Sequence, residues 1–149
     1  MAIQEGDRIP DVNLKVLGEK GPQDISTQDI FAGKKVVLFA VPGAFTPTCS
    51  AAHLPGFVAN ADKLKQKGVD TIACVSVNDA FVMDAWGKDK NADEILMLSD
   101  WNAEFAEALG LTMDATGAGL GVRSKRFAMV VDDGVVSRLA VEEGGKLEV

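Results

Sequence analysis

The feature that most constrains the fold is a set of three short apolar runs separated by segments with helical periodicity. The runs are KVVLFAV at 35–41, VDTIACVSV at 69–77 and EILMLSD at 94–100. The first is continuous and rich in β-branched residues, which is typical of a strand buried on both faces. The second run predicts another buried strand, and the third run predicts a third strand. Such a series predicts a central sheet with helices on its faces.

The segments between these strands carry helical signals. An i, i+3, i+4 pattern that stops at Gly68 is made by Leu54, Phe57, Val58, Ala61 and Leu64. Asn78 and Asp79 are candidate caps of a helix over roughly 80–88, and Gly110 stops a short helix over 101–110. The segment 126–142 contains two strands around an Asp-Gly turn, which predicts a hairpin. We therefore predict an α/β fold with a mixed central β-sheet flanked by helices, in which residues 1 to about 34 give only weak strand signals.

Composition limits the classes of function. A length of 149 residues without repeats or an interdomain linker indicates a single domain over 1–149. A formal net charge of −7 argues against nucleic acid and anionic membranes as partners. No secretory signal or membrane-spanning run is visible, and two cysteines without a framework pattern fit a reducing compartment, so we expect a cytoplasmic protein.

No cofactor is expected. One histidine and two cysteines are too few for a structural zinc site, which requires four ligands. The glycine-rich segment GLTMDATGAGLG, 110–121, follows a helix and precedes a strand, the reverse of the order in a dinucleotide-binding motif. We predict a mobile loop there that positions Arg126.

One cysteine lies in the unusual segment VPGAFTPTCS, 41–50, between the first apolar strand and the helix that follows. Open α/β folds have their sites at this carboxyl edge of the sheet. Thr46 fits a helix N-cap and Pro47 the first helical position, which would put Cys49 in the first turn. A helix terminus supplies at most ~2 kcal/mol, which lowers a thiol pKa by about one unit, while an apolar loop raises it again. A reactive Cys49 therefore needs a cation from another part of the chain. From the residues alone, an inert buried thiol is an equally supported interpretation of Cys49.

The candidate cations lie in two parts of the chain. Arg123, Lys125 and Arg126 precede the penultimate strand, and His53 follows Cys49 by four positions. Arg126 is favoured because a guanidinium stays charged when desolvated and offers a rigid fork of donors. In the alternative interpretation, the three basic side chains are solvated and His53 is packed on its helix.

Four segments carry a more specific signal. They are PGAFTPTCS, HLPGF, CVSVNDAFVMDAWG and GLGVRSKRFAMVVDDGVV. Pro42, Thr46 and Cys49 form a P-x-x-x-T-x-x-C element, and Arg126 opens the R-F-A-M segment. In this order along nearly the whole chain, the segments resemble the type II peroxiredoxins, the subfamily that includes peroxiredoxin 5. The resemblance implies a thioredoxin-like fold and a thiol-specific peroxidase that reduces hydrogen peroxide and alkyl hydroperoxides to water and alcohols.

The resemblance also implies a role for each motif residue. Cys49 would be the peroxidatic cysteine, whose thiolate attacks a peroxide oxygen and becomes a sulfenic acid. The Thr46 hydroxyl would donate to the thiolate or the peroxide. Arg126 would lower the thiolate pKa and hold the peroxide oxygens by charge-assisted hydrogen bonds. Pro42, which has no N–H, would shield the pocket from water.

The second cysteine, Cys74, lies inside a predicted central strand. A disulfide with Cys49 would need Cα atoms within ~7 Å, which a mid-strand residue and a first-turn residue do not satisfy without local unfolding. We therefore expect Cys74 to be inert and a doubtful resolving cysteine. In the favoured mechanism one cysteine reacts and is regenerated by glutathione or glutaredoxin. The alternative is thioredoxin-dependent regeneration through Cys74.

Relatives usually continue into a C-terminal helix, whereas this sequence ends at VEEGGKLEV, so we expect that helix to be truncated or absent.

Phe45, Phe81 and Trp86 have two interpretations. By residue type they belong to the core, whereas the resemblance puts their segments in a homodimer interface beside the active site.

Two rival functions stay open. A non-enzymatic peroxide-sensing redox switch would consume about one equivalent of peroxide, whereas an enzyme consumes many when thiol is supplied. A cysteine hydrolase would need His53 as its base.

Overall fold

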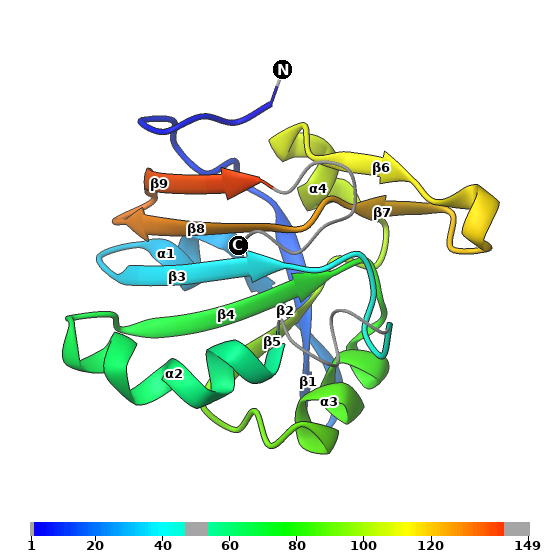
Figure 1. The fold of residues 1–149 in the computed structure, drawn as a ribbon, viewed down its shortest axis with the longest axis horizontal. Helices are drawn as coiled ribbons and strands as arrows, with labels where there is room; N and C mark the ends of the chain where they lie inside the picture. Colours follow the sequence, from blue (N-terminus) through cyan, green and yellow to red (C-terminus); the bar gives the residue numbers. More distant parts are fainter. Residues whose placement is uncertain (1, 47–53, 142–149) are drawn as a thin grey trace.

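The computed structural model describes residues 2–46 and 54–141, and its centre is a mixed sheet in the order β2-β1-β5-β4-β3-β8-β9 (Figure 1). The strands are β1 (Asn13–Gly18), β2 (Gly21–Ser26), β3 (Lys35–Ala40), β4 (Thr71–Ser76), β5 (Ile95–Ser99), β8 (Phe127–Asp132) and β9 (Val135–Val141). β3, β4 and β5 run parallel, whereas β1 pairs antiparallel with β5 and β8 pairs antiparallel with β3. The prediction of a mixed central sheet is confirmed.

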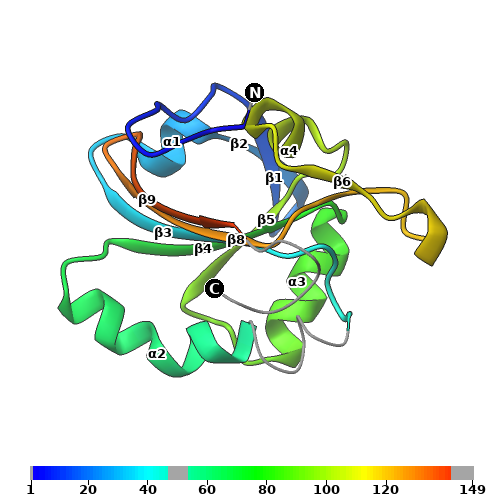
Figure 2. The ribbon, with the colours of Figure 1, turned by 45° about the horizontal axis from the view of Figure 1, so that its top comes forward.

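Helices cover both faces of this sheet (Figure 2). The short helices α1 (Thr27–Phe31) and α4 (Glu104–Leu109) lie on one face, and α2 (Leu54–Gln66) and α3 (Ala80–Asp89) lie on the other. Asp79 caps α3, because its carboxylate accepts the Val82 N–H at 2.8 Å. Gly110 ends α4 in the left-handed conformation, as its position in the sequence predicts. None of the described helices has the length and hydropathy needed to cross a membrane.

The central strands are buried on both faces, with alternate residues on opposite sides of the sheet. One core, towards α1 and α4, receives Val36, Leu38, Ala40, Ala73 and Val75. The other core, towards α2 and α3, receives Val37, Phe39, Ile72 and Cys74. Each fully buried valine, leucine, isoleucine or phenylalanine side chain contributes about 1.5–3 kcal/mol, so both faces stabilise the sheet. This two-sided burial explains why the central strands lack polar alternation in sequence.

Two regions contain more regular structure than their sequences predict. Residues 13–26 form the β1–β2 hairpin, which joins β5 through the pairing of Lys15 with Ser99. The glycine-rich segment 110–121, predicted to be a loop, contains β6 (Thr112–Asp114) and a 3-10 turn, η2 (Thr116–Ala118). β6 pairs with β7 (Val122–Ser124) as a ribbon that projects from the body (Figure 1). The loop prediction was wrong because three-residue strands are too short to show a periodicity of two.

Candidate active site

The predicted site lies at the sheet edge where the parallel strands β3 and β4 end. The loop 42–46 follows β3, and residues 77–79 follow β4. On the neighbouring antiparallel strand, Phe127 pairs with Ala40, so Arg126 lies at the same edge beside the start of this loop. Arg126 is only 7% exposed. Pro42, Thr46 and Arg126 are thus brought to one edge, whereas Cys49 and His53 lie outside the described residues.

The loop 42–46 contains a tight turn. The Thr46 hydroxyl donates to the Gly43 carbonyl at 2.6 Å, and the Thr46 N–H points to the same oxygen at 3.4 Å. Phe45 has a φ of 64°, a left-handed conformation that is unfavourable for a bulky side chain by about 1–3 kcal/mol. In this turn the single hydroxyl proton of Thr46 is donated to the Gly43 carbonyl, so the predicted donation to the thiolate or the peroxide requires the hydroxyl to rotate away from that carbonyl. Its predicted function as a helix N-cap concerns residues 47–53, which lie outside the described residues.

Arg123 binds backbone carbonyls from three segments. Its Nε donates to the Leu120 carbonyl at 2.9 Å. Its Nη1 donates to the Val77 carbonyl at 2.8 Å and to the Pro42 carbonyl at 3.4 Å. The sequence marked Arg123 only as a candidate cation, and the structure shows that it also connects the loops after β3 and β4. The other basic candidate, Lys125, is half-buried, and its backbone N–H donates to the Leu111 carbonyl at 2.7 Å.

Asn78 lies at the same edge and contacts the loop 42–46 directly. Its Oδ1 accepts the Ala44 N–H at 2.9 Å and the Ser76 hydroxyl at 2.7 Å. Its backbone carbonyl accepts the Ser99 hydroxyl at 2.6 Å. Sequence reasoning proposed Asn78 as a helix cap and missed this contact. The available signal was its position directly after a buried strand, at the edge where α/β folds place their sites.

A buried carboxyl completes this edge. Asp100 follows β5, is 3% exposed, and accepts the N–H groups of Phe105 at 3.0 Å and Ala106 at 2.9 Å. Burial raises the pKa of Asp100 above its ordinary value, although the two backbone hydrogen bonds act in the opposite direction. Because both carboxylate oxygens accept backbone N–H groups at the start of α4, we assign Asp100 a structural function.

Cys74 is fully buried in β4, between β3 and β5. Its register partners are Phe39 on β3 and Met97 on β5. Its side chain is 0% exposed and belongs to the core beneath α2 and α3. The prediction of a buried central-strand cysteine is confirmed.

The three aromatic residues fall into two classes. Trp86 is fully buried in the core, whereas Phe45 and Phe81 are 51% and 59% exposed. The Phe45 ring lies 6.4 Å from the Trp86 ring, centroid to centroid, at an interplanar angle of 51°. The core interpretation is therefore correct for Trp86, whose own side chain offers no surface to a partner. The predicted interface would be formed by Phe45 and Phe81.

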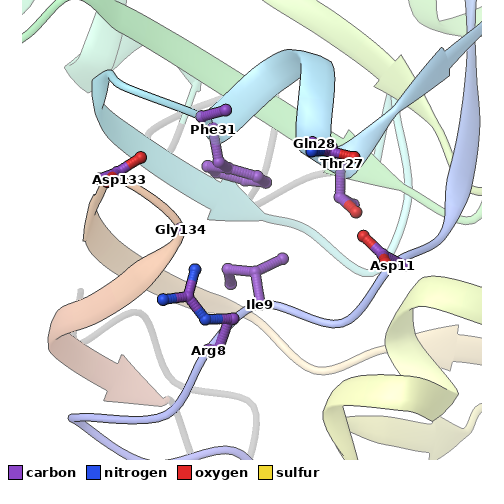
Figure 3. Close-up of a pocket in the computed structure, with 9 residues that line it drawn as sticks. Arg8, Ile9, Asp11, Thr27, Gln28, Phe31, Asp133 and Gly134 are labelled. Carbon is purple, nitrogen blue, oxygen red and sulfur yellow. The ribbon is translucent and has the colours of Figure 1, made fainter.

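A cavity of about 320 Å³ lies at the opposite edge of the sheet, near the start of β3 (Figure 3). Its walls are Arg8, Ile9, Asp11, Thr27, Gln28, Phe31, Ala32, Asp133 and Gly134. Of the predicted site residues that the structure describes, none lines it. Among the described residues, no group of three or more histidine, cysteine, aspartate or glutamate side chains could hold a metal ion.

Comparisons with known proteins identify the family of the chain. The redoxin family matches residues 4–148. Peroxiredoxin-2E of Arabidopsis thaliana, a chloroplastic protein, is 53% identical over 97% of this chain, which spans only 64% of that protein's length. The crystal structure of reduced Prx3 from Vibrio vulnificus in complex with hydrogen peroxide is 58% identical, with a TM-score of 0.95 over 99% of this chain and 92% of that one. The crystal structure of peroxiredoxin 5 from Alvinella pompejana is 40% identical, with a TM-score of 0.85 over 94% of this chain and 90% of that one. The chain therefore belongs to the redoxin family and, within it, to the type II peroxiredoxins.

Proposed function

We propose that the chain is a thiol-specific peroxidase that reduces hydrogen peroxide and alkyl hydroperoxides through Cys49. The observation that carries this proposal is the convergence of Pro42, Thr46 and the buried Arg126 at the sheet edge that leads into the Cys49 segment. The solved relative in complex with hydrogen peroxide supports the same substrate class.

The proposed reaction has two stages. The Cys49 thiolate attacks one peroxide oxygen, so that an S–O bond forms and the O–O bond breaks. The leaving oxygen takes up a proton and departs as water or an alcohol, and Cys49 becomes a sulfenic acid. Arg126 stabilises the charge that spreads over the two oxygens, and Thr46 orients the reacting groups. An external thiol then condenses with the sulfenic acid and releases water, and a second thiol frees Cys49 as a disulfide forms.

The proposed reductant is glutathione or glutaredoxin. The position of Cys74 supports this choice, because Cys74 is fully buried and its strand is paired on both sides. A disulfide between Cys74 and Cys49 would require β4 to leave the sheet or the local structure to open. Thioredoxin-dependent regeneration through Cys74 is therefore the second candidate. Such thiol chemistry fits a reducing compartment, which we take to be the cytoplasm.

We further propose a homodimer that covers Phe45 and Phe81. Both rings are more than half exposed, and Phe45 belongs to the loop that leads into the Cys49 segment. Burial of two aromatic side chains beside the site would exclude water from it. Phe81→Asp should shift the protein towards a monomer in sedimentation at micromolar concentration. An unchanged sedimentation coefficient would contradict this interface.

Intact-mass analysis after one equivalent of hydrogen peroxide, with and without glutathione, tests the cysteine chemistry. It should compare wild type with Cys49→Ser and Cys74→Ala, because alanine avoids burying an unsatisfied hydroxyl at position 74. We expect an oxygen or glutathione adduct in wild type and in Cys74→Ala, and none in Cys49→Ser. A loss of two hydrogens in wild type alone would instead identify Cys74 as the resolving cysteine.

The rival redox switch is separated from an enzyme by stoichiometry. With excess thiol and reductant, an enzyme consumes many equivalents of peroxide per chain, whereas a switch stops after about one. Consumption that ends at one equivalent would favour the switch.

A further inference from the structure

Two side chains outside the recognised motif hold the backbone of the loop 42–46. Asn78 Oδ1 accepts the Ala44 N–H at 2.9 Å. Arg123 Nη1 donates to the Pro42 carbonyl at 3.4 Å and, more closely, to the Val77 carbonyl at 2.8 Å. The loop after β3 is thereby attached to the segment after β4 by two side chains, Asn78 from that segment and Arg123 from β7.

The loop needs such external support. Phe45 lies in the left-handed region, and this strain persists only where surrounding contacts determine the backbone. The contact with Arg123 is also close, because a Cβ atom built on Gly43 would lie 3.3 Å from Arg123 Nη1 and 3.0 Å from Thr46 Cγ2. Gly43 therefore lets the guanidinium and the Thr46 side chain approach the same point of the loop.

We propose that Arg123 and Asn78 are positioning residues for the reaction with peroxide, acting through the backbone of the loop 42–46. Pro42 and Thr46 lie at the two ends of this loop, so their relative placement depends on its conformation. This inference rests on the proposed functions of Thr46 and Cys49. A displacement of about 1 Å in such a site can reduce the rate by ~100-fold, which sets the expected scale.

The contacts distinguish this function from that of Arg126. The three hydrogen bonds of Arg123 go to backbone carbonyls, and the contact of Asn78 with the loop is to a backbone N–H. Both residues thus act on loop geometry, whereas Arg126 is proposed to act on charge. Because the Asn78 side chain is uncharged, its removal should leave the Cys49 pKa nearly unchanged while the peroxide reaction slows.

The test compares two reactions of Cys49 in Asn78→Ala, Arg123→Met and the double variant. We expect the second-order rate constant with hydrogen peroxide to fall by about 10–100-fold in each single variant. Alkylation of the thiolate by chloroacetamide, a neutral reagent that needs no peroxide geometry, should change by less than about threefold, with an unchanged pH midpoint in Asn78→Ala. Because both residues hold the same loop, the double variant should be little slower than the slower single variant.

Two controls are matched to these variants. Ser76→Ala removes the other hydrogen bond to Asn78 Oδ1 and leaves the bond to Ala44, so its peroxide rate should fall less than that of Asn78→Ala. Arg8→Met removes an arginine at the opposite edge and should leave the rate unchanged. If Arg123→Met does not fold, Gly43→Ala tests the same contact from the loop side.

The outcomes separate the two proposals. If wild type is active, Cys49→Ser is inactive, and Asn78→Ala and Arg123→Met keep wild-type peroxide rates, the positioning inference is wrong and the proposed function stands. Equal losses in the peroxide and chloroacetamide reactions would also overturn it, because they would indicate general damage to the Cys49 segment. An active Cys49→Ser, or an inactive wild type, would overturn the proposed function and the positioning inference with it.

Discussion

The two edges of the central sheet differ in what their side chains contact. At the edge where β3 begins, a cavity of about 320 Å³ is lined by Arg8, Asp133 and Gly134 among others. At the edge where β3 ends, Arg123 and Asn78 bind loop backbone, and Arg126 is buried beside them. The first edge offers space, and the second offers polar groups that converge on one loop.

The cavity and the predicted site residues therefore lie in different parts of the molecule. The cavity residue Arg8 is exposed, and the Asp133 carboxylate ties the hairpin turn to the segment before β3 by accepting the Gly33 N–H at 2.6 Å. At the site edge, by contrast, Arg126 has lost most of its contact with water, which strengthens its interaction with an anion. The edge where β3 ends is thus organised by burial of Arg126 and by side-chain hydrogen bonds to the backbone of the loop 42–46.

Exchange of one arginine at each edge should give the largest contrast. Arg126→Met should lower the peroxide rate constant by about 100–1,000-fold, because it removes a charge proposed to stabilise the transition state. It should also raise the Cys49 pKa by roughly 1–3 units, measured by ultraviolet thiolate absorbance against pH. Arg8→Met is the matched control and should change neither quantity. Equal effects of the two variants would contradict the prediction that only the arginine at the end of β3 acts on Cys49.

Replacement of one glycine at each edge should have smaller effects, on the peroxide rate for Gly43 and on stability for Gly134. Gly43→Ala places a methyl group 3.0 Å from Thr46 Cγ2, so we expect the peroxide rate to fall by about 10-fold with little change in stability. Gly134 has a φ of 81° in the hairpin turn, so Gly134→Ala should destabilise the protein by ~1 kcal/mol and leave the rate unchanged. Peroxide kinetics and urea unfolding of both variants measure the two effects. The reverse pattern would contradict the assignment of the edges.

Exchange of one aspartate at each edge should separate buried from exposed carboxylates. Asp100→Asn leaves one of two backbone N–H groups without its acceptor and should lower the free energy of unfolding by about 1–3 kcal/mol. Asp133→Asn retains an acceptor for Gly33 at an exposed turn and should change it by less than ~0.5 kcal/mol. Urea unfolding at constant pH compares the two.

The pH dependence of the Asp100 effect has a defined sign. Because burial raises the pKa of Asp100, the folded protein keeps this proton to higher pH than the unfolded chain does. The contribution of Asp100 to stability is thus fully present below the unfolded pKa and is lost as pH rises through the folded pKa. The difference between wild type and Asp100→Asn should therefore shrink as urea titrations move from about pH 4 to pH 7. A difference that grows with pH would mean that the backbone hydrogen bonds outweigh burial.

Much of the fold was predictable because its signals are local. The strand 35–41, the helix over roughly 80–88 with its cap Asp79 and the turn at Asp133–Gly134 all match the observed elements. Their patterns arise from burial on one or two faces and from turn chemistry, which sequence records directly. The β6–β7 ribbon was missed because its pairing joins residues whose local composition indicates a loop.

Residue type and order were enough to predict the class of fold, the resemblance to the family and the motif residues Pro42, Thr46, Cys49 and Arg126. The folded chain was needed to show that Asn78 and Arg123 hold the loop 42–46 and that Trp86 is core whereas Phe45 and Phe81 are exposed. The physical reason is that these properties depend on contacts between segments distant in the chain. An arginine near a strand has the same local pattern whether its guanidinium meets water, a substrate or three backbone carbonyls.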